Sequence, residues 1–191
     1  SVSILLVFFS LSFSQLMGQE TFRDNFTTAS YSNNDGTQNF ATDWAESGDT
    51  DLGPNGNYIY ITNGRLYFYY LWGESIIREA NLGGATAGTL SFSWRTSGLT
   101  GSKSLQVEIS NNGGASFTTL GTVSGNNNTG NFSTNINAYL STNTVVRFRK
   151  SGNNWDNNDT AYIDNFLISV DQLRPSVKVE DVAVDETIGS V

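Results

Sequence analysis

Hydrophobic and polar residues alternate with a period of two over most of residues 21–170. Leu90, Phe92 and Trp94, for example, are separated by polar side chains. Such alternation is typical of strands with one face in the core and one in water. Segments of this kind, together with short apolar runs, predict strands at residues 22–26, 58–62, 65–72, 75–79, 90–95, 105–110, 117–123, 146–149 and 162–168.

Turn signals separate the predicted strands. Asn63 and Gly64 stand between two apolar runs, which is the strongest short hairpin signal. Gly113 and Gly114 lie at a second predicted hairpin tip, where glycine permits a positive φ. No segment has the helical period. Many short strands joined by turns predict an all-β fold, a two-sheet antiparallel β-sandwich, and a jelly roll is a common way to close one.

The two ends of the chain differ from this central region. Residues 4–13 are apolar and have the length of a signal-peptide core, short of the roughly 20 residues that span a bilayer. We expect residues 1–18 to be a signal peptide that is incomplete at its N-terminus; a buried first strand is the alternative. The sandwich is then expected at residues 19–170, a linker at 171–175, and the truncated start of a further β domain at 176–191. The predicted location is outside the cell, secreted or on the cell surface.

Composition removes several kinds of chemistry. The chain has no cysteine and no histidine, which excludes disulfides, thiolate zinc sites and histidine-dependent catalysis. Its 18 acidic and 10 basic residues give a formal charge of −8, which argues against nucleic acid as a partner and suits divalent cations. Small extracellular animal modules usually carry disulfides, so an exported chain without cysteine points to a bacterial source.

Acidic residues near the two ends of the predicted sandwich suggest a metal site. Asp164 is set into an apolar strand, where an unpaired carboxylate would cost several kcal/mol or more. Neighbouring first and last strands would bring it near the N-terminal acids. The sequence therefore predicts one structural Ca²⁺ held by carboxylates of Asp24, Asp35, Glu46 and Asp164, or by some of these four. The alternative is that Asp164 accepts hydrogen bonds from backbone amides or Arg23.

Aromatic residues form the second candidate site. Residues 65–72 are apolar on both faces, so one face is expected in the core and the other, with Tyr67 and Tyr69, could stack on sugar rings. Trp155 lies in a loop rich in Asn and Asp, which is typical of sugar recognition. These three residues are the predicted ligand-binding residues. Burial in a central strand, for the tyrosines, or as a loop anchor, for Trp155, is the alternative.

Catalytic residues are harder to find. Glycoside hydrolysis needs two facing carboxylates, and sequence spacing does not pair Glu46, Glu74, Glu79 or Glu108. Lys103 and Lys150 lie in no recognisable motif that would activate a serine nucleophile. We therefore expect no enzyme, with a polysaccharide hydrolase as the least favoured reading.

Several short motifs carry a family resemblance. The segments 22–26, 31–37 and 162–165, within residues 21–170, resemble a jelly-roll module, MAM-like or carbohydrate-binding-like, of large bacterial surface or secreted proteins. The resemblance implies an accessory or adhesive role. Residues 176–191 are similar to the opening of Calx-β repeats. The expected function is a non-catalytic binding or adhesion module for a glycan or cell-surface polymer, and a structural spacer without a ligand is the alternative.

Overall fold

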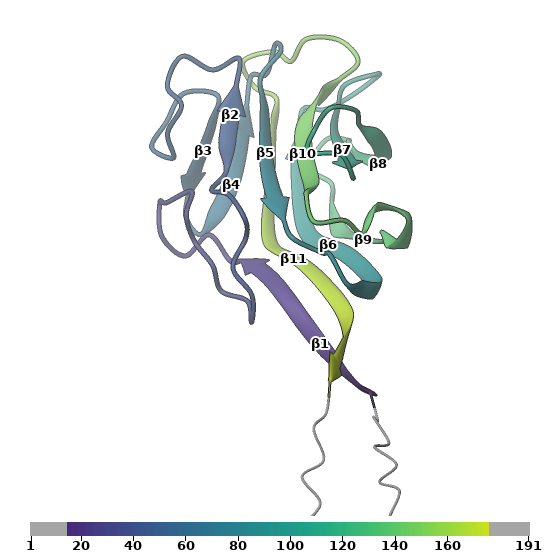
Figure 1. Ribbon diagram of the computed structural model, residues 1–191. Coiled ribbons are helices and arrows are strands. Elements are labelled where there is room, and N and C mark those ends of the chain that lie inside the picture. Colours follow the sequence, from purple (N-terminus) through teal and green to yellow (C-terminus); the bar gives the residue numbers. More distant parts are fainter. Residues whose placement is uncertain (1–14, 176–191) are drawn as a thin grey trace, which may run out of the picture.

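The computed structural model describes residues 15–175 and consists of two facing antiparallel sheets (Figure 1). The elements in chain order are β1 (Gln15–Asp24), β2 (Ala45–Ser47), β3 (Ile59–Thr62), β4 (Arg65–Tyr69), β5 (Ser75–Ala80), β6 (Ala85–Ser97), β7 (Ser104–Ser110), β8 (Thr118–Val123), β9 (Thr129–Asn135), the 3-10 turn η1 (Asn137–Tyr139), β10 (Thr144–Ser151) and β11 (Thr160–Pro175).

Strands that are neighbours in space are mostly distant in sequence. One sheet has the order β3-β4-β11-β6-β9, with β1 also paired to β11, and the other has the order β2-β5-β10-β7-β8. The first and last strands thus lie side by side, and Asp24 is opposite Phe166. This arrangement confirms the predicted all-β sandwich, whose alternating residues divide between a shared core and two outer faces.

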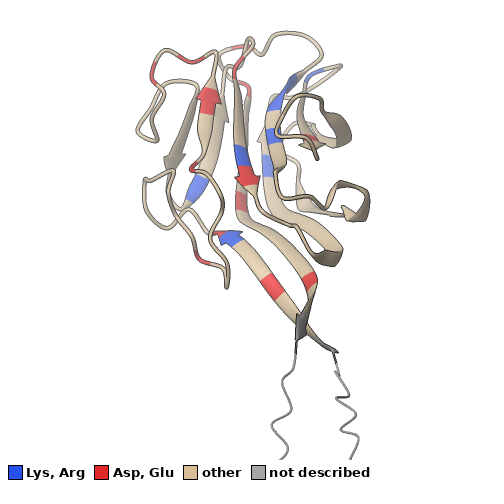
Figure 2. Ribbon diagram, viewed as in Figure 1, with Lys and Arg blue, Asp and Glu red and all other residues tan. Residues whose placement is uncertain are grey.

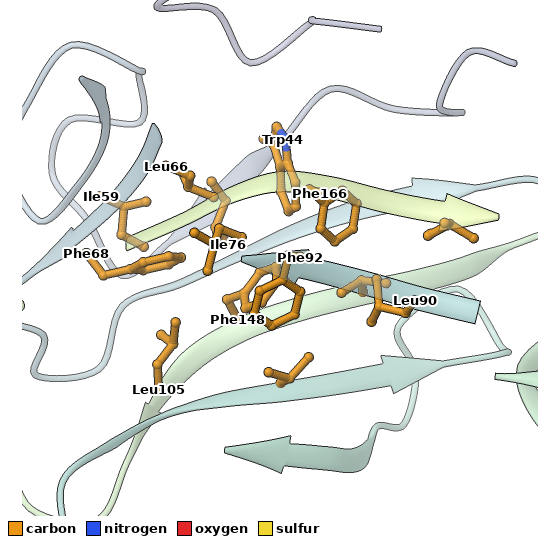
Figure 3. Close-up of a cluster of buried hydrophobic side chains, with 14 of the residues drawn as sticks. Trp44, Ile59, Leu66, Phe68, Ile76, Leu90, Phe92, Leu105, Phe148 and Phe166 are labelled. Carbon is orange, nitrogen blue, oxygen red and sulfur yellow. The ribbon is translucent and has the colours of Figure 1, made fainter. Parts of the chain in front are cut away.

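Aromatic rings fill the space between the sheets (Figure 3). Phe148 from β10 is central: its ring centroid lies 5.9 Å from that of Phe68, 5.4 Å from Phe92 and 6.0 Å from Phe166, all on the opposite sheet. Trp44, from the segment before β2, packs edge-on against Phe166 at 5.1 Å. Full burial of each such side chain contributes about 1.5–3 kcal/mol.

Some strand boundaries differ from those predicted. The strand expected over residues 65–72 ends at Tyr69, because Tyr70 adopts a φ of 53° and breaks the alternation. The segment predicted as a linker, 171–175, is the end of β11 and pairs with residues 15–19 of β1. Backbone pairing with β1 extends this strand independently of the side chains it carries. The change of composition after residue 170 therefore did not mark the end of the strand. β2 and β9 were not predicted.

Residues 1–14 of the predicted signal peptide lie outside the described residues. The predicted further domain at residues 176–191 also lies outside them. Residues 15–18 of the predicted signal peptide lie in β1. Within residues 15–175, no helix is both long and apolar enough to cross a membrane.

Candidate ligand-binding face

Three tyrosines stand in a row across the outer face of the β3-β4-β11-β6-β9 sheet. Tyr60 on β3 is directly opposite Tyr67 on β4, and Tyr67 is opposite Tyr162 on β11. Their ring centroids are 5.0 Å apart for the first pair and 6.2 Å for the second, whose rings are nearly parallel at 20°. All three are half-buried while their strand neighbours, such as Leu66, face the core. The three rings make a continuous aromatic strip.

The same row continues into polar side chains. Tyr162 is opposite Arg95 on β6, and Arg95 is opposite Thr129 on β9; both of these are exposed. In the next row along the strands, Asp164 is opposite Ser93. The sheet therefore presents ring faces next to hydrogen-bonding groups, which is the combination that fixes the orientation of a bound molecule.

A shallow depression of about 400 Å³ lies where these rows meet. Its lining residues are Arg65, Ser93, Trp94, Arg95, Asn127, Thr129, Tyr162 and Asp164. The guanidinium carbon of Arg65 lies 4.6 Å from the centroid of the Tyr162 ring, a cation–π contact that holds the arginine over the strip.

A β-bulge in β11 sets the position of Asp164. The pairing with β6 shifts between Asp164 and Leu167, and Asn165 in the bulge has a φ of 54°. The Asp164 Oδ1 accepts a hydrogen bond of 2.6 Å from the backbone N–H of Asn165, and the Ser93 hydroxyl donates to the Asp164 carbonyl at 3.2 Å. Bulges often redirect a side chain beside a functional site.

The hydroxyl of Tyr60 is a candidate hydrogen-bonding group at one end of the strip. Burial, and after it the neighbouring Tyr67 and Tyr69, raises the pKa of Tyr60 above its ordinary value of 10.0. The phenol therefore keeps its proton and can donate as well as accept a hydrogen bond.

The predicted ligand-binding residues divide into two groups. Tyr67 lies in the strip, and Tyr69, half-buried, lies one row further on the same face, opposite Thr160. Trp155 is only 1% exposed. Its backbone N–H donates to the carbonyl of Leu71 at 3.1 Å, so the loop folds inwards and the indole packs into the core. A role for Trp155 in contacting a ligand at the surface is therefore wrong, and the alternative of a loop anchor describes it.

The predicted calcium ligands are not gathered at one point. Asp24 points into the core, where its Oδ2 accepts hydrogen bonds from Arg78 at 2.6 Å and from the Trp44 indole at 2.9 Å. Asp164 is on the outer face of the same sheet, since it lines the depression there. Over residues 15–175, no three carboxylates lie close enough together to hold a metal ion. The prediction of one calcium site formed by all four residues is therefore wrong, and calcium binding itself stays a prediction.

The other two predicted ligands have protein partners. Asp35 Oδ2 accepts a hydrogen bond from the backbone N–H of Asn25 at 2.8 Å. Glu46 Oε1 accepts one from the hydroxyl of Tyr31. Burial, and after it the negative charges of Asp49 and Asp51, raises the pKa of Glu46 to about 8.

Several residues of the face were not singled out from the sequence: Tyr60, Tyr162, Arg65 and Arg95. Each lies on a predicted strand, and the alternation of apolar and polar residues along that strand indicates that its side chain points outwards. What the sequence does not contain is the register between strands, because a shift of one residue would move every side chain to the other face.

Comparisons with known proteins concern the fold. No protein-family model matches the chain, and no curated protein sequence matches it. Among solved structures, the chain is similar to a variant of a family 29 carbohydrate-binding module complexed with mannohexaose, with a TM-score of 0.52 and 15% identity over 81% of this chain and 92% of that one. A second variant of that module gives a TM-score of 0.50 and 14% identity over 82% and 93%. At this identity the likeness shows a shared fold.

Proposed function

We propose that this chain is a non-catalytic module that binds glycan chains on the outer face of the β3-β4-β11-β6-β9 sheet. The observation that carries the proposal is the row of Tyr60, Tyr67 and Tyr162, which continues without a break into Arg95 and Thr129. Sugar rings have apolar faces that pack on aromatic rings and hydroxyls that bond to polar neighbours. The strip and its polar edge offer both.

The fold comparison supports a sugar ligand. The module that shares this fold was solved with mannohexaose, and the likeness extends over most of both chains. We further propose, as the sequence indicates, that the module is exported and belongs to a larger extracellular protein. A spacer without a ligand is less well supported, because such a domain has no need for three half-exposed tyrosines in one row.

Hydrolysis is not part of the proposal. Glu108 accepts hydrogen bonds from Arg147 at 2.6 Å and from Arg149 at 3.0 Å, so its carboxylate is held by structural partners. Glu74 Oε2 accepts hydrogen bonds from the backbone N–H groups of Trp72 and Gly73. The carboxylates of Glu74 and Glu108 are thus engaged in the fold, which argues against a catalytic role for these two residues.

The test is a glycan array followed by isothermal titration of any polysaccharide that binds. We expect Tyr67→Ala and Tyr162→Ala each to weaken binding by about tenfold or more, since one stacking contact contributes on the order of 1–3 kcal/mol in comparable base stacking. Phe117→Ala is the matched control: its ring lies under Arg147 on the outer face of the other sheet. Melting curves establish that each variant is folded. Equal binding by all three variants, or no binding by the wild type, would contradict the proposal.

A further inference from the structure

The outer face of the β3-β4-β11-β6-β9 sheet also concentrates arginines without ion-pair partners. Arg65 and Arg95 line the depression beside the tyrosine strip, and Arg23 is exposed on β1. None of the three forms an ion pair in the described part of the chain. The basic residues that form ion pairs there are Arg78, Lys103, Arg147 and Arg149. Three guanidinium groups are therefore free to meet an anionic ligand.

The three arginines line two adjoining depressions on this face. Arg65 lies over Tyr162, and Arg95 is opposite Tyr162 on β6. A second depression, of about 330 Å³, shares Ser93 with the first and is lined by Arg23 at its far end. Ser91 lies in the row of Arg23 and is four positions from Arg95 along β6, so the Arg95 and Arg23 rows are about 13 Å apart along the strands at roughly 3.3 Å per residue.

Acidic groups on this face are few. Asp164 lines the first depression, and its Oδ1 already accepts the backbone N–H of Asn165, which lines the second. Asp171 is half-buried towards the end of β11. The face thus carries three positive and two negative side chains in a chain whose formal charge is −8. Figure 2 shows basic positions in blue on β1 and β4 of this sheet, and on β5 and β10 of the other sheet.

We propose that the glycan bound by this face is acidic, a polysaccharide that carries uronic acid carboxylates. The inference rests on the proposed function and adds the ligand class. The tyrosines pack on the sugar rings, while Arg65 and Arg95 receive ring carboxylates in bidentate hydrogen bonds, the geometry that guanidinium groups form best. Arg23 meets a carboxylate further along the same chain.

Charge favours this ligand over single-stranded nucleic acid. A nucleic acid strand carries a phosphate on every nucleotide and is bound through a continuous basic groove. Here three arginines alternate with Asp164 and with uncharged residues such as Ser93. This pattern suits a polymer whose charges are carboxylates spaced along sugar units.

The experiment measures binding of the chain to polygalacturonate, alginate and hyaluronan, each beside its carboxyl-reduced form, which keeps the rings and removes the charge. Neutral mannan, cellulose and galactan oligosaccharides and a single-stranded DNA oligonucleotide complete the panel. We expect at least one acidic polymer to bind about tenfold or more tightly than its reduced form, with affinity that falls as salt is added.

Variants identify the groups responsible. Arg65→Gln and Arg95→Gln are expected to remove the preference for the acidic form, so that the acidic and reduced forms bind each variant with affinities within about threefold of one another, while Asp164→Asn strengthens binding of the acidic form. Lys150→Gln is the control and is expected to change nothing: Lys150 is on β10 of the other sheet, forms no ion pair with the described residues, and donates to the Gly152 carbonyl at 3.2 Å.

Each outcome decides between the two proposals. Equal binding of acidic and reduced polymers, or binding of neutral glycans alone, overturns the acidic ligand and leaves the proposed function standing. Tightest binding to the oligonucleotide overturns the acidic glycan in favour of nucleic acid. Binding to no member of the panel overturns both the ligand class and the proposed function.

Discussion

Arg78 and Asp24 form an ion pair inside the sandwich, with Arg78 Nη1 2.6 Å from Asp24 Oδ2 and both side chains fully buried. The guanidinium also donates to the carbonyls of Asn33 at 2.5 Å and Thr42 at 3.2 Å, and it lies 3.9 Å from the Phe40 ring centroid. The pair thus ties the long segment between β1 and β2 to the strands beneath it.

Asp24→Ala should destabilise the domain strongly. It leaves the Arg78 charge buried without a counter-ion, which costs about 3–5 kcal/mol when one partner of a buried pair is removed. Urea unfolding measures the loss. Asp35→Ala is the matched control, since this exposed carboxylate accepts one backbone hydrogen bond and its removal should cost about 0.5–1.5 kcal/mol. Equal losses in the two variants would show that the pair has no special role.

Trp155→Ala is expected to reduce stability and leave glycan binding intact in the folded fraction. The indole is 1% exposed, so its truncation removes a large buried group at a cost of about 3–5 kcal/mol. Trp155→Phe should cost less, because the indole N–H has no hydrogen-bond partner among the described residues. Urea unfolding and titration with a bound glycan separate the two effects. Weaker binding at full stability would restore Trp155 as a ligand-contacting residue.

Glu46 makes stability depend on pH. Its carboxyl has a pKa of 4.5 when unperturbed and about 8 in the folded chain, so between these values the folded state binds more protons than the unfolded state. The free energy of unfolding therefore falls as pH rises through this range. Glu46→Gln stays neutral, so its melting temperature should decline less over the same range.

Melting curves taken from pH 5 to pH 8 test this, with Glu79→Gln on β5 as the control for loss of one negative charge. Parallel curves for the wild type and Glu46→Gln would mean that the Glu46 carboxyl does not hold a proton in this range.

Asp164→Ala tests the calcium site predicted from the sequence. A site at 100 times its dissociation constant would add about 2.7 kcal/mol and raise the melting temperature by several degrees. Because Asp164 is on the outer face and Asp24 is bound to Arg78 in the core, we expect wild type and Asp164→Ala to respond alike when EDTA is replaced by millimolar Ca²⁺. A rise in the wild type that Asp164→Ala abolishes would establish this carboxylate as a ligand.

Local pattern was sufficient for most strands and failed at identifiable places. Residues 90–95 and 105–110 alternate strictly and are strands in the structure. β9 has a single large apolar residue, Phe132, which stacks on Phe92 at 4.9 Å, and a strand with so little apolar pattern has no signal of its own. Tyr70 continues the apolar run in sequence yet turns the chain, leaving Leu71 fully buried and Trp72 55% exposed.

The sequence by itself determined the class of fold and the presence of surplus aromatic residues, because side-chain alternation and turn residues act over a few neighbouring positions. Only the tertiary structure decided which of them lie together on one outer face. Tyr60, Tyr67 and Tyr162 come from three strands whose register aligns them, while Trp155 is drawn into the core. Register and burial arise from contacts between segments far apart in the chain, and no local pattern records those contacts.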